Sequence, residues 1–294
     1  MKPEHFVVPP EWGWYIVWYF YLGGIAGGAY LLGTLLKLRG GLRDVPVSRL
    51  AFFLSFAAMA VCPVLLTLDL GQPGRFWHML IDRSHGGLAF KYWSPMSVGA
   101  WVLLFFGAFC TATFAAAVAQ ARGSEPKGRL GALLRIAYGR GFLAVGSVLG
   151  LFLAGYTGVL LSVSSQPLWS DTWALGGLFL ASGLSVAAAA LVLLARWRHA
   201  DLATTGFLRE VDGSFITLEL MLLVICFASL GRVGIEYARW PWLLLWLLVL
   251  GLSVGSLVVR KRVAGGGVVP AATMVLIGGL ALRIVVVFAP QVHA

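Results

Sequence analysis

Long apolar runs, each about as long as a membrane span, dominate the pattern of the chain. A helix needs about 20 mostly apolar residues to cross a bilayer, and eight runs reach that length. Because backbone groups in lipid must be satisfied within their own segment, these runs predict helices rather than strands. The sequence therefore predicts an all-α integral membrane protein, a single transmembrane domain over 1–294 whose eight transmembrane helices form two four-helix bundles. The expected helices are about 14–36, 50–68, 97–120, 141–163, 173–195, 214–232, 241–259 and 267–289.

The composition excludes a soluble enzyme. Apolar residues make up 60% of the 294 residues and charged residues only 12%, whereas a soluble domain carries roughly a quarter charged residues. The net charge of +10 could indicate nucleic acid, but the charges lie in the loops between the apolar runs. We interpret them as orientation charges and expect membrane lipid, and no nucleic acid, around this chain.

The positive charges also predict an orientation. Fifteen of the 22 lysines and arginines follow the first, third, fifth and seventh runs, and positive loops favour the cytoplasmic side. Both termini and the loops at 69–96, 164–172 and 233–240 are therefore expected outside. Tryptophans gather at that outer boundary more densely than an interfacial belt requires: Trp12, Trp14, Trp18, Trp93, Trp169, Trp173, Trp240 and Trp242.

Histidine and cysteine argue against a metal centre in this protein. A membrane haem b needs axial histidines within its helices, and the three cysteines are too scattered for a thiolate site. We therefore expect no haem, no bound metal and no catalytic residue of its own. The histidines all lie in loops or tails: His5, His78, His85, His199 and His293.

The loop at 69–96 is long, aromatic and balanced in charge. Loops of this length are typically functional or disordered, and its composition argues against disorder. Helix capping is the alternative explanation, in which Asp69 ends one helix, Gly71 and Pro73 break it, and Ser94 or Ser97 caps the next. Both explanations can hold at once.

Tyr156 lies in the outer half of the fourth run, among serines and threonines. A phenol can donate a hydrogen bond to a quinone oxygen, which makes this tyrosine a candidate ligand-binding residue. Ordinary packing is equally compatible with the residues alone, and the nearby serines are interpreted as bonding to their own helix.

The first run contains two glycine pairs, Gly23 with Gly27 and Gly24 with Gly28. Small residues four apart let helices approach closely. The pairs predict helix packing first, and they also leave room for a flat ligand.

Two ionisable residues, Glu219 and Arg283, lie within apolar runs. Charged groups inside a membrane are costly and indicate function by default. We expect Glu219 within a turn or two of the cytoplasmic end, where it could reach water, and Arg283 about two turns below the outer end, where it could meet an interfacial carboxylate.

The sequence resembles the NrfD/PsrC family, the quinone-interacting membrane subunits of polysulfide reductase and related respiratory complexes. The match covers the first four helices, and the last four match only in number and hydropathy. The turn with Asp-Leu-Gly-x-Pro-x-Arg-Phe, followed by Ser-Pro-Met-Ser, is the specific part. The residues that carry the match are Tyr19–Ala29, Asp69–Phe76, Ser94–Ser97 and Tyr156–Trp169.

The resemblance implies a haem-free subunit in the inner (cytoplasmic) membrane of a bacterium or archaeon. It would bind menaquinone or ubiquinone and exchange electrons with a four-cluster ferredoxin-like iron–sulfur subunit. That partner would be attached to a catalytic subunit, often a molybdopterin enzyme. Tyr156 matches the quinone-bonding tyrosine of the family, and Tyr19 falls where some members place a polar residue. We expect Asp69 to complete the quinone pocket.

Two further roles are expected of the ionisable and aromatic residues. Asp69 is the expected first proton acceptor at the outer face, with Glu219 and Arg283 as candidate proton-transfer residues deeper in the membrane. The alternative is a membrane anchor, or a proton- or ion-translocating subunit without its own redox site. The outer loops should form the docking surface for the iron–sulfur partner, with Arg75, Trp77, His78, Trp93 and Trp169 on it.

Overall fold

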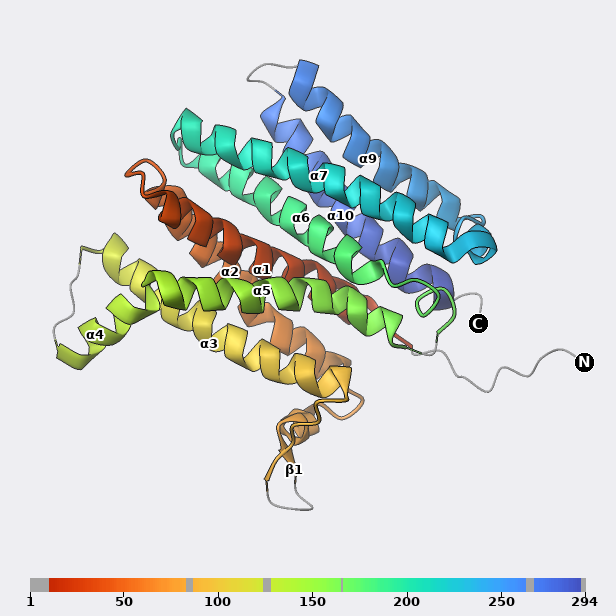
Figure 1. Cartoon of the computed structure of the whole chain (residues 1–294), viewed down its shortest axis with the longest axis horizontal. Coiled ribbons are helices and arrows are strands. Elements are labelled where there is room, and N and C mark those ends of the chain that lie inside the picture. The colour runs from red at the N-terminus through yellow and green to blue at the C-terminus, as the bar shows by residue number, and fades with distance from the viewer. Residues whose placement is uncertain (1–10, 83–86, 124–127, 165, 263–266, 292–294) are drawn as a thin grey trace, which may run out of the picture.

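Long helices lying side by side make up the body of the protein (Figure 1). The computed structural model describes residues 11–82, 87–123, 128–164, 166–262 and 267–291. Within these ranges, eight helices are long and apolar enough to cross a membrane, which confirms the predicted membrane fold. They are α1 (Trp14–Arg39), α2 (Val45–Asp69), α3 (Pro95–Ala121), α5 (Arg140–Ser162), α6 (Leu175–Trp197), α7 (Leu202–Leu230), α9 (Trp242–Arg262) and α10 (Val268–Gln291).

The contacts between these helices divide them into two sets of four. In the first set, α1 and α3 each pack against both α2 and α5. In the second set, α6 packs against α7 and α10, and α9 packs against the same two helices. The sets meet mainly where α6 contacts α1 and α5 (Figure 1). α1 and α6 are therefore the central helices of the molecule.

Successive long helices run in opposite directions, so the connections gather at two ends. We call the end with the α1–α2, α3–α5, α6–α7 and α9–α10 connections the basic end, and the opposite one the aromatic end. The basic end carries α4 (Gly128–Ala137). The aromatic end carries η2 (Gly231–Val233) and α8 (Gly234–Tyr237), and also η1 (Pro73–Met79), β1 (Ile81–Asp82) and β2 (Gly87–Leu88).

The segment between α2 and α3 contains the described strands. β1 and β2 pair antiparallel, with Ile81 opposite Leu88. The sequence predicted a long loop here and did not predict this short hairpin. We call the described part of 70–94 the outer segment.

α7 differs most from the expected helices. It begins at Leu202, about three turns before the expected start near 214. The Asp201 carboxylate caps this start by accepting a hydrogen bond from the Ala203 amide at 2.8 Å. Charged residues such as Arg209 and Glu210 interrupt the apolar run, although they lie on the helix itself. A prediction based on the length of the apolar run therefore places the start of α7 too late in the sequence.

The glycines of α1 allow backbone contacts on two sides. Gly27 lies directly against the backbone of Gly150 on α5, without room for a side chain between them. On the other side, a Cβ at Gly24 would lie 3.0 Å from the Gly183 Cα of α6. The predicted close packing of the glycine pairs is thus confirmed, and it holds α1 between the two sets.

Replacing Gly27 with Ala should lower the thermal stability of the protein in detergent or nanodiscs. The new methyl group must push α1 away from α5, and overpacking of this kind costs about 1–3 kcal/mol. Gly251→Ala is the matched control, because nothing lies within 4 Å of a Cβ there. Equal melting temperatures for the two variants would contradict the contact.

Candidate functional site

Two buried tyrosines lie near each other in the first set of helices. Tyr19 of α1 is 2% exposed and Tyr156 of α5 is 7% exposed. The Tyr19 side chain is within electrostatic range of Tyr156 and of Cys62 on α2. Three helices therefore bring together the two tyrosines that the sequence singled out.

The hydroxyl groups of these tyrosines differ in their hydrogen bonds. The Tyr156 hydroxyl donates to the Pro95 carbonyl oxygen at 2.6 Å, in the first turn of α3. Its ring packs on Gly99, where any Cβ would overlap it, and the Ser94 side chain caps the same helix end. The Tyr19 hydroxyl has no hydrogen-bond partner among the described residues. It is therefore available to donate to a ligand, whereas Tyr156 would have to release Pro95.

Asp69 lies nearer the surface than the tyrosines. It is the last residue of α2 and is partly buried. Cys62, which is close to Tyr19, precedes it by two helical turns, a rise of about 10 Å. No hydrogen bond or ion pair joins Asp69 to either tyrosine. The structure thus places Asp69 between the tyrosine pair and the aromatic end.

The ends of α2 and α3 near the tyrosines are incompletely covered by the rest of the protein. Beyond Cys62, no residue of α2 is fully buried, although two turns of helix present every face. Before Gly99, no residue of α3 is fully buried either. Val64 and Met96 are 55% and 53% exposed. The tyrosine pair therefore lies beside helix surfaces that lipid or an apolar ligand can contact.

The outer segment is largely exposed and stands apart from the long helices (Figure 1). None of the residues Pro73–Met79 is buried, and Trp93 is 68% exposed. Arg75 and His78 are exposed, and the rings of His78 and Trp77 lie 4.0 Å apart. Four of the five predicted docking residues thus occur together in this part of the protein.

Trp169 does not belong to that surface. It is fully buried, and its indole donates to the Val286 carbonyl of α10 at 2.7 Å. Its ring stacks on Trp12 at 5.2 Å between centroids, and the Trp12 amide donates to Gln291 at 2.9 Å. The expectation that Trp169 contacts a partner is wrong, because it joins the start of α1 to the end of α10.

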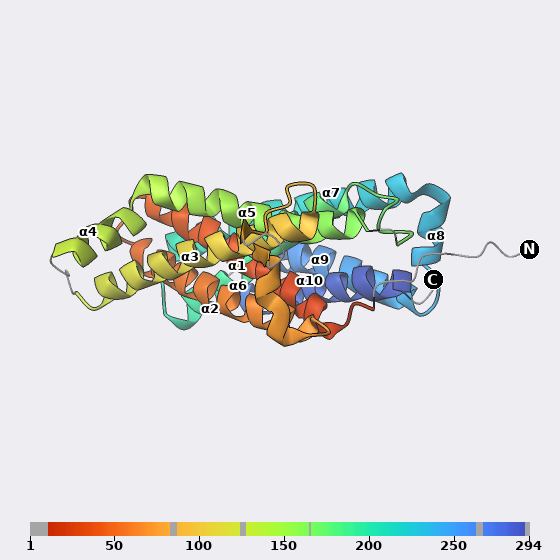
Figure 2. The same ribbon diagram turned by 90° about the horizontal axis from the view of Figure 1, so that it is seen from below.

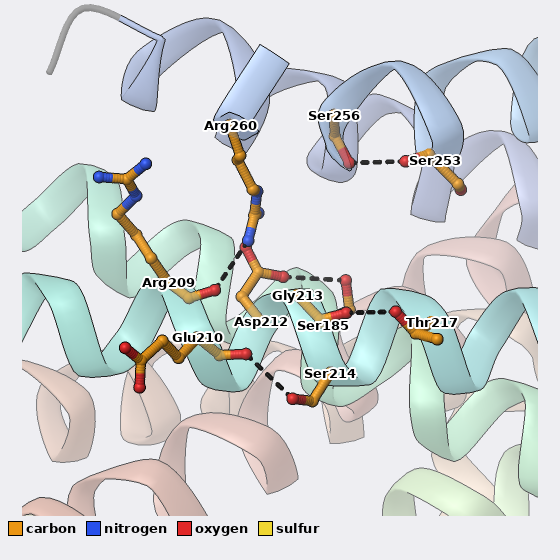
Figure 3. A network of polar contacts seen from close by, with 10 residues as sticks. All are labelled: Ser185, Arg209, Glu210, Asp212, Gly213, Ser214, Thr217, Ser253, Ser256 and Arg260. Carbon is orange, nitrogen blue, oxygen red and sulfur yellow. Dashed lines mark hydrogen bonds and ion pairs between the residues drawn. The ribbon is translucent and has the colours of Figure 1, made fainter. Parts of the chain in front are cut away.

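The second set contains a buried acid that the sequence analysis missed. Asp212 of α7 is fully buried. Its carboxylate accepts a hydrogen bond from the Ser185 hydroxyl of α6 at 3.2 Å and pairs with Arg260 of α9 (Figure 3). Arg260 also donates to the Arg209 carbonyl at 2.9 Å. The capping Asp201 was the signal that could have extended the helix over Asp212.

Glu219 lies deeper than expected. It is 5% exposed and follows the start of α7 by about 25 Å of helix, so it does not sit within two turns of the basic end. It lies two turns beyond Asp212 on the same helix face. Its carboxyl group interacts with Ser182 of α6 and is within electrostatic range of Arg283.

Arg283 is fully buried where the two sets meet. Its guanidinium donates to the Ser182 hydroxyl at 2.7 Å and to the Gly279 carbonyl at 2.8 Å. It also lies over the rings of Tyr21 and Phe179, at 5.7 and 5.3 Å from their centroids. The prediction that Arg283 meets a carboxylate at the membrane interface is therefore wrong. The acid near its guanidinium is Glu219.

In the described ranges, no three His, Cys, Asp or Glu residues come together as a metal site. His78 lies in η1, and His199 follows α6. Three of the histidines on which the haem argument rests, His5, His85 and His293, lie outside the described residues.

Comparison with known proteins gives the same family along nearly the whole sequence. The model of the family described as "Polysulphide reductase, NrfD" matches residues 5–294. The C chain of polysulfide reductase from Wolinella succinogenes is 28% identical over 95% of this protein and 94% of its own length. Protein NrfD of Escherichia coli K12 is 26% identical over 95% of each protein.

A third relative matches a shorter part. The C subunit of selenate reductase from Mesobacillus selenatarsenatis is 30% identical over 36% of this protein and 22% of its own length. The family model also covers the last four helices, in which the sequence analysis found no family motif. The protein therefore belongs to the polysulphide reductase NrfD family.

Proposed function

We propose that this protein is the haem-free membrane subunit of a reductase complex, that it binds quinone or quinol, and that it exchanges electrons with an iron–sulfur subunit. The observation that carries the proposal is the buried pair Tyr19 and Tyr156 beside the incompletely covered ends of α2 and α3. Two of its relatives are named as single components of a polysulfide reductase and a selenate reductase, which supports a role within a larger complex.

A quinone fits the chemistry of this region. Its ring carries two carbonyl oxygens, and its apolar tail belongs in lipid, so it needs hydrogen-bond donors close to lipid. The Tyr19 hydroxyl can donate to one oxygen. The Tyr156 oxygen can accept a hydrogen bond from a quinol hydroxyl while its own hydrogen stays bonded to Pro95, or it can donate to a quinone after releasing Pro95. Menaquinone and ubiquinone share these features, and both suit the site.

Asp69 is the proposed first proton acceptor. Oxidation of a quinol releases protons as well as electrons, and general bases at the site must carry them to water. Asp69 is only partly buried and lies at the aromatic end of α2, beyond the tyrosine pair. Protons would thus leave by the short route to that end.

The outer segment is the proposed docking surface for the iron–sulfur subunit and, through it, a catalytic subunit of the molybdopterin type. It offers exposed Trp93 and Arg75, residue types that protein interfaces favour. It connects α2 to α3, the two helices that border the tyrosine pair. A partner here would therefore lie close to the quinone.

Proton movement through the second set is the second candidate function. Asp212 lies on α7 between the basic end and Glu219, so this set holds two buried acids on one helix. The carboxylates of Asp212 and Glu219 each interact with a serine of α6, Ser185 and Ser182 respectively. Arg283 then lies between Glu219 and α1. Membrane-embedded acids in such a row are typical of proton relays.

Replacing Tyr19 or Tyr156 with Phe should weaken quinone binding. Loss of a buried hydrogen bond to the ligand costs about 1–3 kcal/mol, or about 5- to 150-fold in dissociation constant. Quinol turnover by the complex and quinone binding by the purified protein are the measurements. Tyr30→Phe is the control, because Tyr30 is a buried phenol bonded to Thr113 instead. Unchanged binding in both site variants would overturn the assignment.

Assembly of the complex should protect the outer segment. Cleavage by protease between 69 and 96 should be slower in the complex than in the isolated protein, because a docked partner excludes the protease. Arg75→Glu together with Trp93→Ala should reduce recovery of the partner with the tagged protein. Trp173→Ala is the control, since Trp173 is 75% exposed but lies outside the segment. Equal cleavage in both states would remove the docking proposal.

The two proton routes can be separated in proteoliposomes with a pH-sensitive dye. Asp69→Asn should slow proton release and quinol turnover together, because it removes the first acceptor. Glu219→Gln should leave turnover intact, because protons are proposed to leave through Asp69. A loss of turnover in this variant would instead support proton movement through the second set. Glu210→Gln, an exposed acid on the same helix, is the control. If Glu219→Gln abolishes proton uptake from the basic end while Asp69→Asn has no effect, the route through Asp69 is wrong.

A further inference from the structure

The short helix α4 at the basic end is fixed to the bundle mainly where it ends. Gly131 is buried within the helix and Ala137 at its last residue, and Tyr138, the next residue, is buried as well. The Lys37 ammonium of α1 lies 3.3 Å from the centroid of the Tyr138 ring. That ring also meets Phe52 of α2, with centroids 5.7 Å apart. These contacts set the rotation of α4 about its axis.

The fixed rotation leaves an apolar stripe exposed. Leu130 is 59% exposed, and Leu133 and Ile136 are each 62% exposed. Residues three apart lie on one side of a helix, so the three side chains form a continuous row. No other part of the described protein covers this row, although each side chain is large and apolar.

Exposed arginines surround the stripe. Arg129 and Arg135 lie on α4 itself, Arg122 ends the preceding helix, and Arg140 begins the following one. All four are exposed. None forms an ion pair with an acidic side chain in the part of the sequence that the structure describes. The surroundings of α4 are therefore strongly positive.

The position of α4 relates both features to the membrane. Two residues separate it from α5, so its last turn lies at the level where that membrane-spanning helix begins. Figure 2 shows it at one extremity of the bundle, and Figure 1 shows it inclined to α3 and α5. Further along α5, Val145 and Val148 are 52% and 65% exposed, as lipid-facing residues are.

We propose that α4 is an interfacial helix that binds anionic phospholipid. The Leu130–Leu133–Ile136 stripe enters the acyl region of the leaflet at the basic end, and Arg129 and Arg135 contact the lipid phosphates. An apolar face beside exposed basic residues is the arrangement of helices that lie in a membrane surface. Anionic lipid supplies both an apolar environment for the stripe and negative charge for the arginines. The inference does not depend on the proposed quinone site.

The position of the stripe can be measured with nitroxide labels in nanodiscs that contain phosphatidylglycerol. A label at Leu133→Cys should be more accessible to oxygen than to a water-soluble nickel chelate, because it lies in acyl chains. A label at Ala132→Cys, about 100° around the helix, should show the opposite preference. Unmodified protein gives the background, since Cys62, Cys110 and Cys226 are buried. Access of the nickel chelate to position 133 would overturn the proposal, as would protection from both reagents, which indicates a protein partner or a second copy.

The charge requirement needs a local measurement. Photoactivatable phosphatidylglycerol should cross-link to 128–140 with a higher yield than the matching phosphatidylcholine at equal mole fraction. Arg129→Gln with Arg135→Gln should lower this preference, by about fivefold for each arginine if both contact phosphate. Arg196→Gln with Arg198→Gln removes the same charge elsewhere at the basic end and should leave it unchanged. A preference that survives the first double variant would exclude a role for these arginines.

Discussion

The backbone contact of α1 with α5 and α6 is the constraint on which the remaining arrangement depends. Gly27 meets Gly150 on one side, and Gly24 meets Gly183 on the other, so α1 lies between the two sets of helices. In lipid, moving an apolar side chain from the acyl chains into a helix interface gains little free energy. Close packing between the helices must therefore hold them together. The same contact sets the depth of Tyr19, which lies on α1 five residues before Gly24.

The membrane fold could be predicted because it depends on few quantities. Span length, the absence of charge and the turn residues locate seven of the eight spans to within a few residues, and the glycine pairs anticipate their packing. The start of α7 could not be read from apolar length, because Asp212 is buried and paired with Arg260. A partner distant in sequence makes a charged residue acceptable there, and no local pattern reports that partner.

The candidate site was predictable only where a residue stands out from its own helix, because contacts with distant parts of the sequence leave no local pattern. Tyr19 and Tyr156 stand out as phenols in apolar helices, and the structure brings them together. Trp169 was predicted to lie on the docking surface because it falls in an outer loop rich in tryptophan, yet it is buried against α10. Arg283 likewise pairs within the bundle rather than at its surface. In each case the decisive neighbour lies more than 100 residues away.

The packing of α1 has a consequence for biogenesis. α1 has the lowest hydropathy of the eight spans and the same high degree of burial as α6. It is synthesised before α5 and α6, so it must first reside in lipid with its glycine faces exposed and unpartnered. Of the eight spans, α1 therefore gains least from insertion into lipid. Its packing is completed only when α5 and α6 have been inserted. The earliest span of the described sequence is thus among the last to reach its final surroundings.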